Sequence, residues 1–529
     1  MAASRKSEKS NGLPIPVIDL FAGPGGLGEG FSSLPAPDGG WAFRIRLSIE
    51  KDPVAHHTLE LRAFFRQFPS GKAPLNYYRH IRGEIGRDEL FNAYPDQAEA
   101  ARNEAWQCEL GVENAGRVRN RINMALEGAD RWILIGGPPC QAYSIAGRSR
   151  NAGIKNYDPA QDPRQKLYVE YLQVIADHTP AVFVMENVKG LLSAKVENVR
   201  IFEKILADLQ SPCEALRTEG RPVPYKNTLH YTLHSLSPHQ SRLISQAPSP
   251  EDFLIRAEQH GVPQARHRLI LVGVRSDLSL TPGSLPIKPE VTMRQATNGL
   301  PPLRSGLSKE VDGPAEWLAA LRAGPGLWHP NPHGTAALLD NIFIQSLVGA
   351  GRQFEAPQFD RGGEFLQCKA HPPNGLDKIH DPRIGGVCNH STRAHMAADL
   401  HRYFFAACFA KAYGRSPTLS DFPKKLLPDH ENLQDALNSG HFSDRFRVQL
   451  PDRPSTTITS HISKDGHYYI HYDPTQCRSL TVREAARLQT FPDNYFFCGG
   501  RTAQYTQVGN AVPPLLAAAI ANVLYEMLK

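Results

Sequence analysis

Residues 15–28 read Ile-Pro-Val-Ile-Asp-Leu-Phe-Ala-Gly-Pro-Gly-Gly-Leu-Gly, an apolar run that enters a cluster of glycines. This pattern is typical of a buried parallel strand that turns into a helix. Similar apolar runs recur at 132–135, 181–185 and 269–274, and a helical pattern covers 164–177. Strands alternating with helices predict a doubly wound α/β sheet, with functional residues where the strands end.

The glycine cluster matches G-x-G-x-x-G through Gly23, Gly25 and Gly28, and Glu50 follows where a carboxylate can bind a ribose hydroxyl. Phe21, just before the loop, is suited to stack on an adenine. A nicotinamide dinucleotide and S-adenosylmethionine both fit these features. A plain strand-to-helix turn with Glu50 as a surface carboxylate is the alternative. The loop alone does not choose among them.

A second loop carries reactive chemistry. Residues 136–140 read Gly-Gly-Pro-Pro-Cys directly after an apolar run, and Glu186-Asn-Val188 follows another. A lone cysteine is most often a small buried hydrophobe. Here the thiol of Cys140 and the carboxyl of Glu186 are both expected at strand ends, which favours covalent attack assisted by proton transfer.

Five strings in fixed order carry a specific resemblance. They are Asp19-Leu-Phe-Ala-Gly-Pro-Gly-Gly26, Gly137-Pro-Pro-Cys-Gln141, Glu186-Asn-Val188, Gln264-Ala-Arg-His-Arg268 and Gln507-Val-Gly-Asn510. Together they resemble the motifs of the bacterial-type DNA (cytosine-5)-methyltransferase family, over roughly residues 14–275 and 453–529. The resemblance implies an α/β, doubly wound, Rossmann-like domain that uses S-adenosylmethionine, and a smaller, loop-rich target-recognition domain.

The resemblance also assigns roles to single residues. Cys140 would add to C6 of a flipped-out cytosine, Glu186 would hold N3 and the amino group, and Arg266 and Arg268 would contact the base oxygen and a phosphate. For each arginine, a surface salt bridge is the alternative. The expected cofactor contacts are Asp19, Phe21, Gly23, Gly25, Gly26, Glu50, Pro139, Leu167 and Asn510, and the expected DNA contacts are Gln141 and Ser144. Asn510 also suits a turn before Pro513.

One family motif is poorly matched. In place of the usual Gly-Asp-Ile-like cofactor loop, the chain offers only Arg79-His-Ile-Arg-Gly83, followed by an apparent helical insertion. The residue that contacts the adenine amino group is therefore left open.

The order of segments predicts a domain organisation. We expect a disordered terminus at 1–13, a catalytic part at 14–275, a target-recognition domain at 276–475 and a return to the catalytic domain at 476–529. The middle segment is rich in Pro, Gly and His. Helices are expected at 394–413, at 482–489 as an amphipathic helix, and at 515–528, with residues 507–514 as a loop.

Two details of the middle segment are also predicted. His390-Ser-Thr-Arg-Ala-His395 suggests a helix start capped by Ser391 or Thr392, with Arg393 or Arg402 meeting a DNA phosphate or forming a solvated face. A scattered cluster of cysteines and histidines could bind zinc or could consist of ordinary loop residues. Its spacing is not that of a common zinc finger, which favours the second interpretation. The cluster consists of Cys368, His371, His380, Cys388, His390 and His395.

Bulk properties limit the remaining functions. The chain has 529 residues, 41% apolar and 21% charged, with eight cysteines and a net charge of +6. We see no apolar run near the roughly 18 residues of a membrane span and no secretion signal, so we expect a cytoplasmic, nucleoid-associated monomer with no membrane partner. Its expected partners are double-stranded DNA and cognate restriction or defence proteins. The rivals are a cytosine-5 methyltransferase for structured RNA, a non-catalytic DNA-binding regulator and a nicotinamide dehydrogenase.

Overall fold

The structure is a computed structural model that describes residues 13–139, 166–196, 199–224, 229–238, 249–324, 355–369, 371–429 and 443–529. Its centre is a sheet in the order β3-β2-β1-β4-β5-β11-β8, with β9 paired to β11. The strands are β1 (Ile15–Leu20), β2 (Phe43–Glu50), β3 (Ala105–Gln107), β4 (Ile133–Gly136), β5 (Val182–Val188), β8 (Tyr231–His234), β9 (Leu254–Arg256) and β11 (His267–Arg275). The first five are parallel, whereas β11 runs antiparallel to β5, β8 and β9.

Helices cover both faces of this sheet, as the doubly wound prediction requires. Neighbouring residues of a strand point to opposite faces, so Val17 and Ile18 of β1 belong to different hydrophobic clusters. One face packs on α1 (Gly26–Ser32) and α18 (Pro514–Leu528). The other packs on α6 (Ala115–Leu126), α8 (Lys166–His178), α9 (Ile201–Gln210) and α10 (Pro212–Thr218). The four strands predicted from apolar runs are confirmed.

The segment between β2 and β3 contains four helices joined by short loops. It comprises α2 (Pro53–Arg66), α3 (Leu75–Ile81), α4 (Arg87–Ala93) and α5 (Pro95–Glu104). These helices share a core with Ile384 and Cys388 from the second region of the chain. The expected insertion is therefore present, and it bridges the two regions.

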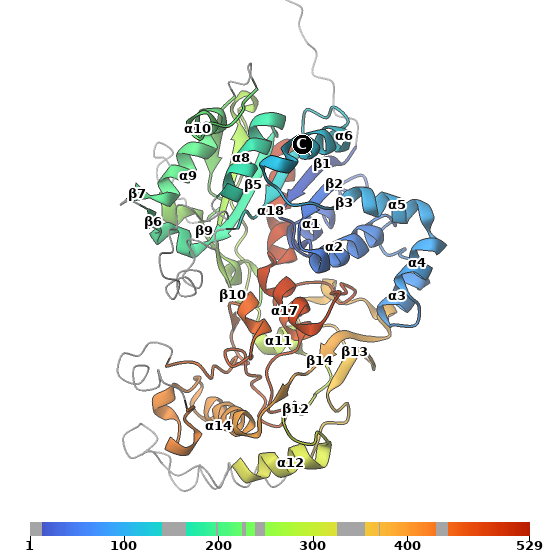
Figure 1. The fold of residues 1–529 in the computed structure, drawn as a ribbon, viewed down its shortest axis with the longest axis vertical. Coiled ribbons are helices and arrows are strands. Elements are labelled where there is room, and N and C mark those ends of the chain that lie inside the picture. The colour runs from blue at the N-terminus through green and yellow to red at the C-terminus, as the bar shows by residue number, and fades with distance from the viewer. Residues whose placement is uncertain are drawn as a thin grey trace, which may run out of the picture.

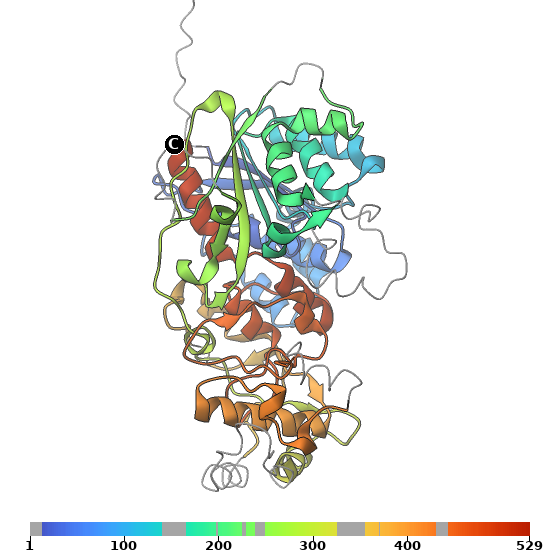
Figure 2. The same cartoon turned by 90° about the vertical axis from the view of Figure 1, so that its left-hand side faces the viewer.

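The second region lies below the sheet in Figure 1 and contains short strands, long connections and an aromatic core. Its main elements are α11 (Met293–Thr297), β12 (Gly306–Leu307), α12 (Pro314–Ala323), β13 (Gly362–Gln367), β14 (Gly386–Ser391), β15 (Ala394–His395) and α14 (Ala397–Tyr413). In the side view of Figure 2, α14 and its neighbours lie at the end of the molecule remote from the sheet. This agrees with the smaller, loop-rich domain expected.

The predicted helix start at His390 is wrong. Residues Gly386–Ser391 form β14, and α14 begins after Met396, which makes no side-chain cap. Arg393 is buried and donates to the Lys464 and Ile462 carbonyls, while Arg402 pairs with Asp399 and the Leu426 carbonyl. Both guanidiniums bond within the protein, so neither forms the solvated helix face that was one of the two expectations.

The C-terminal helices also differ from the sequence-based predictions. Every residue of α16 (Val482–Leu488) is buried, so the polar side chains of this helix do not form the solvent-exposed face that an amphipathic surface helix would have. Gln507 to Asn510 form the last turn of α17 (Arg501–Asn510), so the predicted loop begins only at Ala511. The stretch Arg501–Leu528 is long and apolar enough for a membrane span by composition. It is two helices separated by a break after Asn510, and most of its apolar stretch is buried inside the protein.

Candidate active site

A cavity of about 1390 Å³ opens where β1, β2, β4 and β5 end. Parallel strands place the loops after their carboxyl ends at one edge of the sheet, so segments far apart in sequence meet here. Of the predicted site residues, the lining includes Phe21, Gly23, Gly26, Glu50, Pro139, Leu167, Glu186, Arg266, Arg268 and Asn510. Cys140, Gln141 and Ser144 lie outside the described residues.

The loop from β1 to α1 is shaped by its unusual backbone. Gly23 and Gly25 adopt positive φ angles of 57° and 96°, which glycine tolerates without a steric penalty. Gly26 is required by close packing, because an added Cβ would lie 2.3 Å from the Val512 carbonyl oxygen. The segment before α18, which contains Val512, therefore packs directly against the start of α1.

Glu50 holds that loop in place. Its carboxylate accepts hydrogen bonds of 2.8 Å from the backbone N–H of Gly23 and of 2.8 Å from that of Asp52. Asp52 in turn caps α2 by accepting from Val54 and Ala55. A carboxylate has more lone pairs than these two bonds use, so Glu50 keeps acceptor capacity toward the cavity.

Two predicted cofactor contacts do not line the cavity. Gly25 packs against Leu59 and Tyr495. Asp19 is fully buried below the loop, and burial raises the pKa of this carboxyl to about 8 despite the opposing charge of Arg66. Asp19 lies beside Gly28 of α1 and does not line the cavity, so the expectation that it contacts the cofactor directly is not met.

Glu186 and Arg268 form an ion pair at the cavity wall. The Arg268 Nε lies 2.8 Å from Glu186 Oε1, and each side chain is only 12% exposed. Antiparallel pairing of β5 and β11 brings them together, with Arg268 opposite Val188. On the other side, an added Cβ at Gly137 would lie 3.0 Å from Glu186 Oε2, so the Gly136-Gly-Pro-Pro loop passes beside this carboxylate.

Arg266 has a different environment from Arg268. Its guanidinium is buried and donates to the Ile458 carbonyl at 2.7 Å and the Gly509 carbonyl at 3.3 Å. Burial, with the nearby charge of Arg268, holds the pKa of Arg266 well below its usual range. Arg266 thus ties residues 457–460 to the end of α17, although it also reaches the cavity wall.

Gln264 reinforces this connection. Its side chain accepts from the Ile458 N–H at 2.7 Å and donates to the Leu488 carbonyl and to Gln489. The short strands β10 (Gln264–Ala265) and β16 (Ser455–Thr456) pair beside it. The two segments that resemble family motifs, residues 264–268 and 453–459, therefore pack against each other.

The sequence pattern missed the residues after β3. Cys108, Glu109 and Leu110 line the cavity, whereas Arg79 and Ile81 belong to α3. Residues 79–83, the poor match to the family's cofactor loop, do not line the cavity. The insertion of α3 to α5 moves the third strand some 25 residues further along the chain than the motif spacing suggested, and β3 itself is only three residues long.

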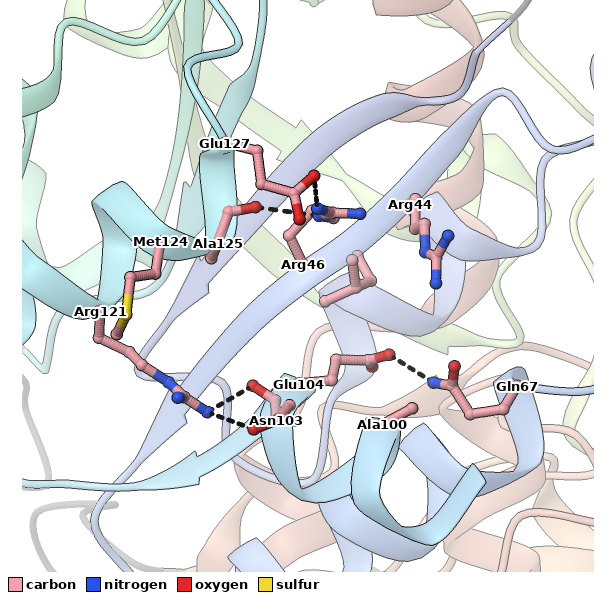
Figure 3. A pocket seen from close by; sticks show the side chains of 11 residues that line it. Arg44, Arg46, Gln67, Ala100, Asn103, Glu104, Arg121, Met124, Ala125 and Glu127 are labelled. Carbon is pink, nitrogen blue, oxygen red and sulfur yellow. Dashed lines mark hydrogen bonds and ion pairs between the residues drawn. The ribbon is translucent and has the colours of Figure 1, made fainter. Parts of the chain in front are cut away.

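The side chains of the predicted Cys/His cluster do not line this cavity. Among the described residues, no three His, Cys, Asp or Glu side chains are placed to hold a metal ion. Within the Cys/His cluster, Cys388 packs in the insertion core, while His390 bonds to Thr481 and the Pro301 carbonyl. A smaller hollow of about 380 Å³ lies away from the strand ends, and Figure 3 shows Arg46 paired with Glu127 and Arg121 with Asn103 there.

Comparison with known proteins identifies the class. Residues 112–212 and 391–526 match the family described as C-5 cytosine-specific DNA methylase. The chain is 30% identical to the type II methyltransferase M.Bpa9945I of Bacillus paralicheniformis, over 97% of this chain and 99% of the relative. It is 25% identical to M.AgeI of Thalassovita gelatinovora, over 96% and 98%. A crystal structure of a prophage-encoded DNA modification methyltransferase (E. coli) has 18% identity over 97% and 99% of the chains, at a TM-score of 0.48.

The chain therefore belongs to the C-5 cytosine-specific DNA methylase family, and its enzyme class is DNA (cytosine-5-)-methyltransferase. The similarity covers the middle segment as well, beyond the two stretches that carried the motif resemblance.

Proposed function

We propose that this enzyme transfers a methyl group from S-adenosylmethionine to C5 of a cytosine within a specific duplex sequence, through a covalent adduct with Cys140. The observation that supports this most directly is the Glu186 and Arg268 ion pair at the wall of the strand-end cavity, beside the loop that leads to Cys140.

The cavity residues fit the methyl donor. Glu50 retains acceptor capacity for ribose hydroxyls, and Phe21 and Leu110 provide apolar surface suited to an adenine. Glu109 carries a carboxylate at the cavity edge, paired with Lys51 at 3.1 Å, and is our candidate for the adenine amino group. When bound, S-adenosylmethionine supplies an electrophilic methyl group.

The protein groups carry the activation of the base. C5 of cytosine is a weak nucleophile, so the Cys140 thiolate adds to C6 and shifts the ring electrons toward C5. Glu186 accepts from the exocyclic amine, takes up a proton from solvent as the base binds, and donates that proton to N3 as charge develops there. Arg268 orients Glu186 and faces the base oxygen. After C5 has been methylated, solvent takes up the C5 proton, the Cys140 thiolate leaves C6, and Glu186 takes back the proton from N3, which restores the aromatic ring and the free enzyme.

Access to C6 requires the cytosine to leave the base stack. Flipping costs a few kcal/mol, and we assign Gln141 and Ser144 to the DNA side of this step. We assign recognition of the surrounding sequence to the region at 276–475, because base-edge contacts need a separate reading surface. A role beside a restriction nuclease or defence assembly completes the proposal.

The test is methyl transfer in two settings. Tritium from labelled S-adenosylmethionine should enter duplex DNA and not transfer RNA. Bisulfite sequencing of host DNA should reveal protected cytosines in one sequence context after expression of the wild type and none after expression of Cys140→Ala. Incorporation into transfer RNA alone, or full activity of Cys140→Ala, would contradict the proposal.

A further inference from the structure

A short segment after α16, residues 492–498, contacts both halves of the molecule. We call it the junction segment. The Asp493 N–H donates to the Ile379 carbonyl at 2.7 Å, and the Phe497 N–H donates to Asn389 at 3.0 Å. Between these contacts with the second region, the Tyr495 hydroxyl donates to the Pro24 carbonyl in the first glycine loop.

Asn494 stands at the centre of a buried polar network. Its side-chain amide donates to Asp381 Oδ2 at 2.7 Å, and its side-chain oxygen accepts from Arg62 at 3.0 Å. Arg62 in turn pairs with both carboxylate oxygens of Glu29, on α1. One amide therefore connects a carboxylate of the second region to the helix that follows the glycine loop.

The insertion closes the same network from the other side. The Tyr78 hydroxyl on α3 donates to Asp381 Oδ2 at 2.8 Å, and Arg383 forms two further side-chain bonds to the same carboxylate. Burial alone would raise the pKa of Asp381, but the bonds from Arg383, Asn494 and Tyr78 outweigh it, so the pKa lies below the ordinary value. Asp381 therefore stays charged and fully bonded.

Burial makes the geometry of this network specific. Asp381, Asn494, Arg62 and Glu29 are 5–7% exposed. Hydrogen bonds to buried charges are directional, and a partner left unpaired is strongly unfavourable, so such networks tolerate few alternative arrangements. Hydrophobic packing alone would allow the two regions to slide more freely.

We propose that Asp381 is a positioning residue for DNA: with Tyr78, Asn494 and Arg62 it fixes the target-recognition region relative to the glycine loop and the catalytic cavity. This rests on the proposed function. A base read by one region is then presented at a set distance from the chemistry in the other, and a shift of about 1 Å would weaken productive binding.

The test compares steady-state kinetics of Asp381→Asn and Tyr78→Phe with the wild type, on duplex DNA that the wild type methylates. We expect the KM for DNA to rise about 10-fold in Asp381→Asn and about 3-fold in Tyr78→Phe, with kcat within about 3-fold. Binding of S-adenosylhomocysteine in the absence of DNA should stay within about 2-fold. Asp399→Asn is the matched control, because Asp399 pairs with Arg402 inside the second region at 2.8 Å and makes no contact across the junction.

A merely structural role predicts a different result. Fewer folded molecules would lower kcat and leave the KM for DNA unchanged, and that outcome, or unchanged kinetics in both variants, overturns the inference. Tyr78→Phe removes one hydroxyl and decides the matter if Asp381→Asn fails to fold. Absence of methyl transfer by the wild type to any DNA would instead count against the proposed function.

Discussion

Arg268 and Glu186 meet across two antiparallel strands, with Nε 2.8 Å from Oε1, at the wall of the strand-end cavity. Each side chain is nearly buried and has lost most of its hydration. The opposite charge of the partner compensates for this loss. The pair is rigidly placed because β5 and β11 are central strands of the sheet. A carboxylate held in this way presents one fixed edge to a ligand.

Replacing Glu186 tests whether that edge takes part in chemistry. Glu186→Gln keeps the size of the side chain and removes its ability to provide a proton, so kcat should fall about 10²- to 10³-fold while DNA binding changes by less than about 10-fold. Methyl incorporation and gel-shift titration measure the two effects. Asp177→Asn is a control remote from the cavity, since Asp177 pairs with Arg119. A Glu186→Gln enzyme with normal kcat would exclude Glu186 from the reaction.

Glu50 should govern binding of the methyl donor. Glu50→Gln loses the charge that accepts from Gly23 and Asp52, and bonds to charged groups are worth about 1.5–3 kcal/mol. We expect the Kd for S-adenosylhomocysteine, measured by calorimetry, to rise about 10- to 100-fold. Glu127→Gln, at an exposed salt bridge, should leave it unchanged. Equal affinities in the two variants would argue against a role for Glu50.

Gly26 is predicted to tolerate no side chain. In Gly26→Ala the new Cβ would lie 2.3 Å from the Val512 carbonyl oxygen, and because a Cβ and a carbonyl cannot rotate away, the backbone must shift at one of the two residues. Overpacking of this kind lowers the free energy of unfolding by about 1–3 kcal/mol. Chemical denaturation should detect this loss, whereas Gly86→Ala, which meets nothing within 4 Å, should change stability by less than about 1 kcal/mol. Similar stability of the two variants would show that the backbone at Gly26 or Val512 can shift at little cost in free energy.

Asp19 gives the fold a predicted pH dependence. Its pKa is raised to about 8 in the folded protein by burial, above the unfolded value of about 3.9. The unfolded chain therefore releases this proton at lower pH than the folded one. The contribution of the Asp19 proton to the free energy of unfolding is complete below about pH 4 and is lost as the pH rises through about 8.

Asp19→Asn mimics the protonated carboxyl and should remove this loss. The free energy of unfolding of Asp19→Asn minus that of the wild type should be about 4 kcal/mol larger at pH 8 than at pH 5. Urea titrations at the two pH values measure the difference. If the wild type and Asp19→Asn respond to pH in parallel, Asp19 is ionised in the folded state.

Much of the catalytic fold followed from the sequence because local signals agreed with the final packing. The apolar runs at 15–20 and 181–185 are buried on both faces, so they read as parallel strands from hydrophobicity alone. Glu186 and Arg268 were found through motifs that stand at strand ends. Their ion pair follows from strand order, which places β11 beside β5 and which no local pattern specifies.

The misjudged features depend on long-range packing. Cys108 to Leu110 were missed because two helices, α4 and α5, separate them from the weak motif match at residues 79–83. The helix at 482–488 carries charged residues that resemble a solvated face, yet Arg483 and Arg487 are buried and bond to carbonyls and to Asp493. His390 lies in a strand because β14 pairs with β13, a contact that local propensity does not reveal.

Covalent trapping tests the central claim most directly. Duplexes of varied sequence that carry 5-fluoro-2′-deoxycytidine should capture the enzyme in the presence of S-adenosylmethionine, because fluorine at C5 cannot leave as a proton and the bond from Cys140 to C6 then persists. We predict a protein–DNA adduct that survives denaturing electrophoresis with the wild type and is absent with Cys140→Ala. An enzyme that methylates unmodified duplex DNA but forms no adduct, or forms it equally well as Cys140→Ala, would contradict the account.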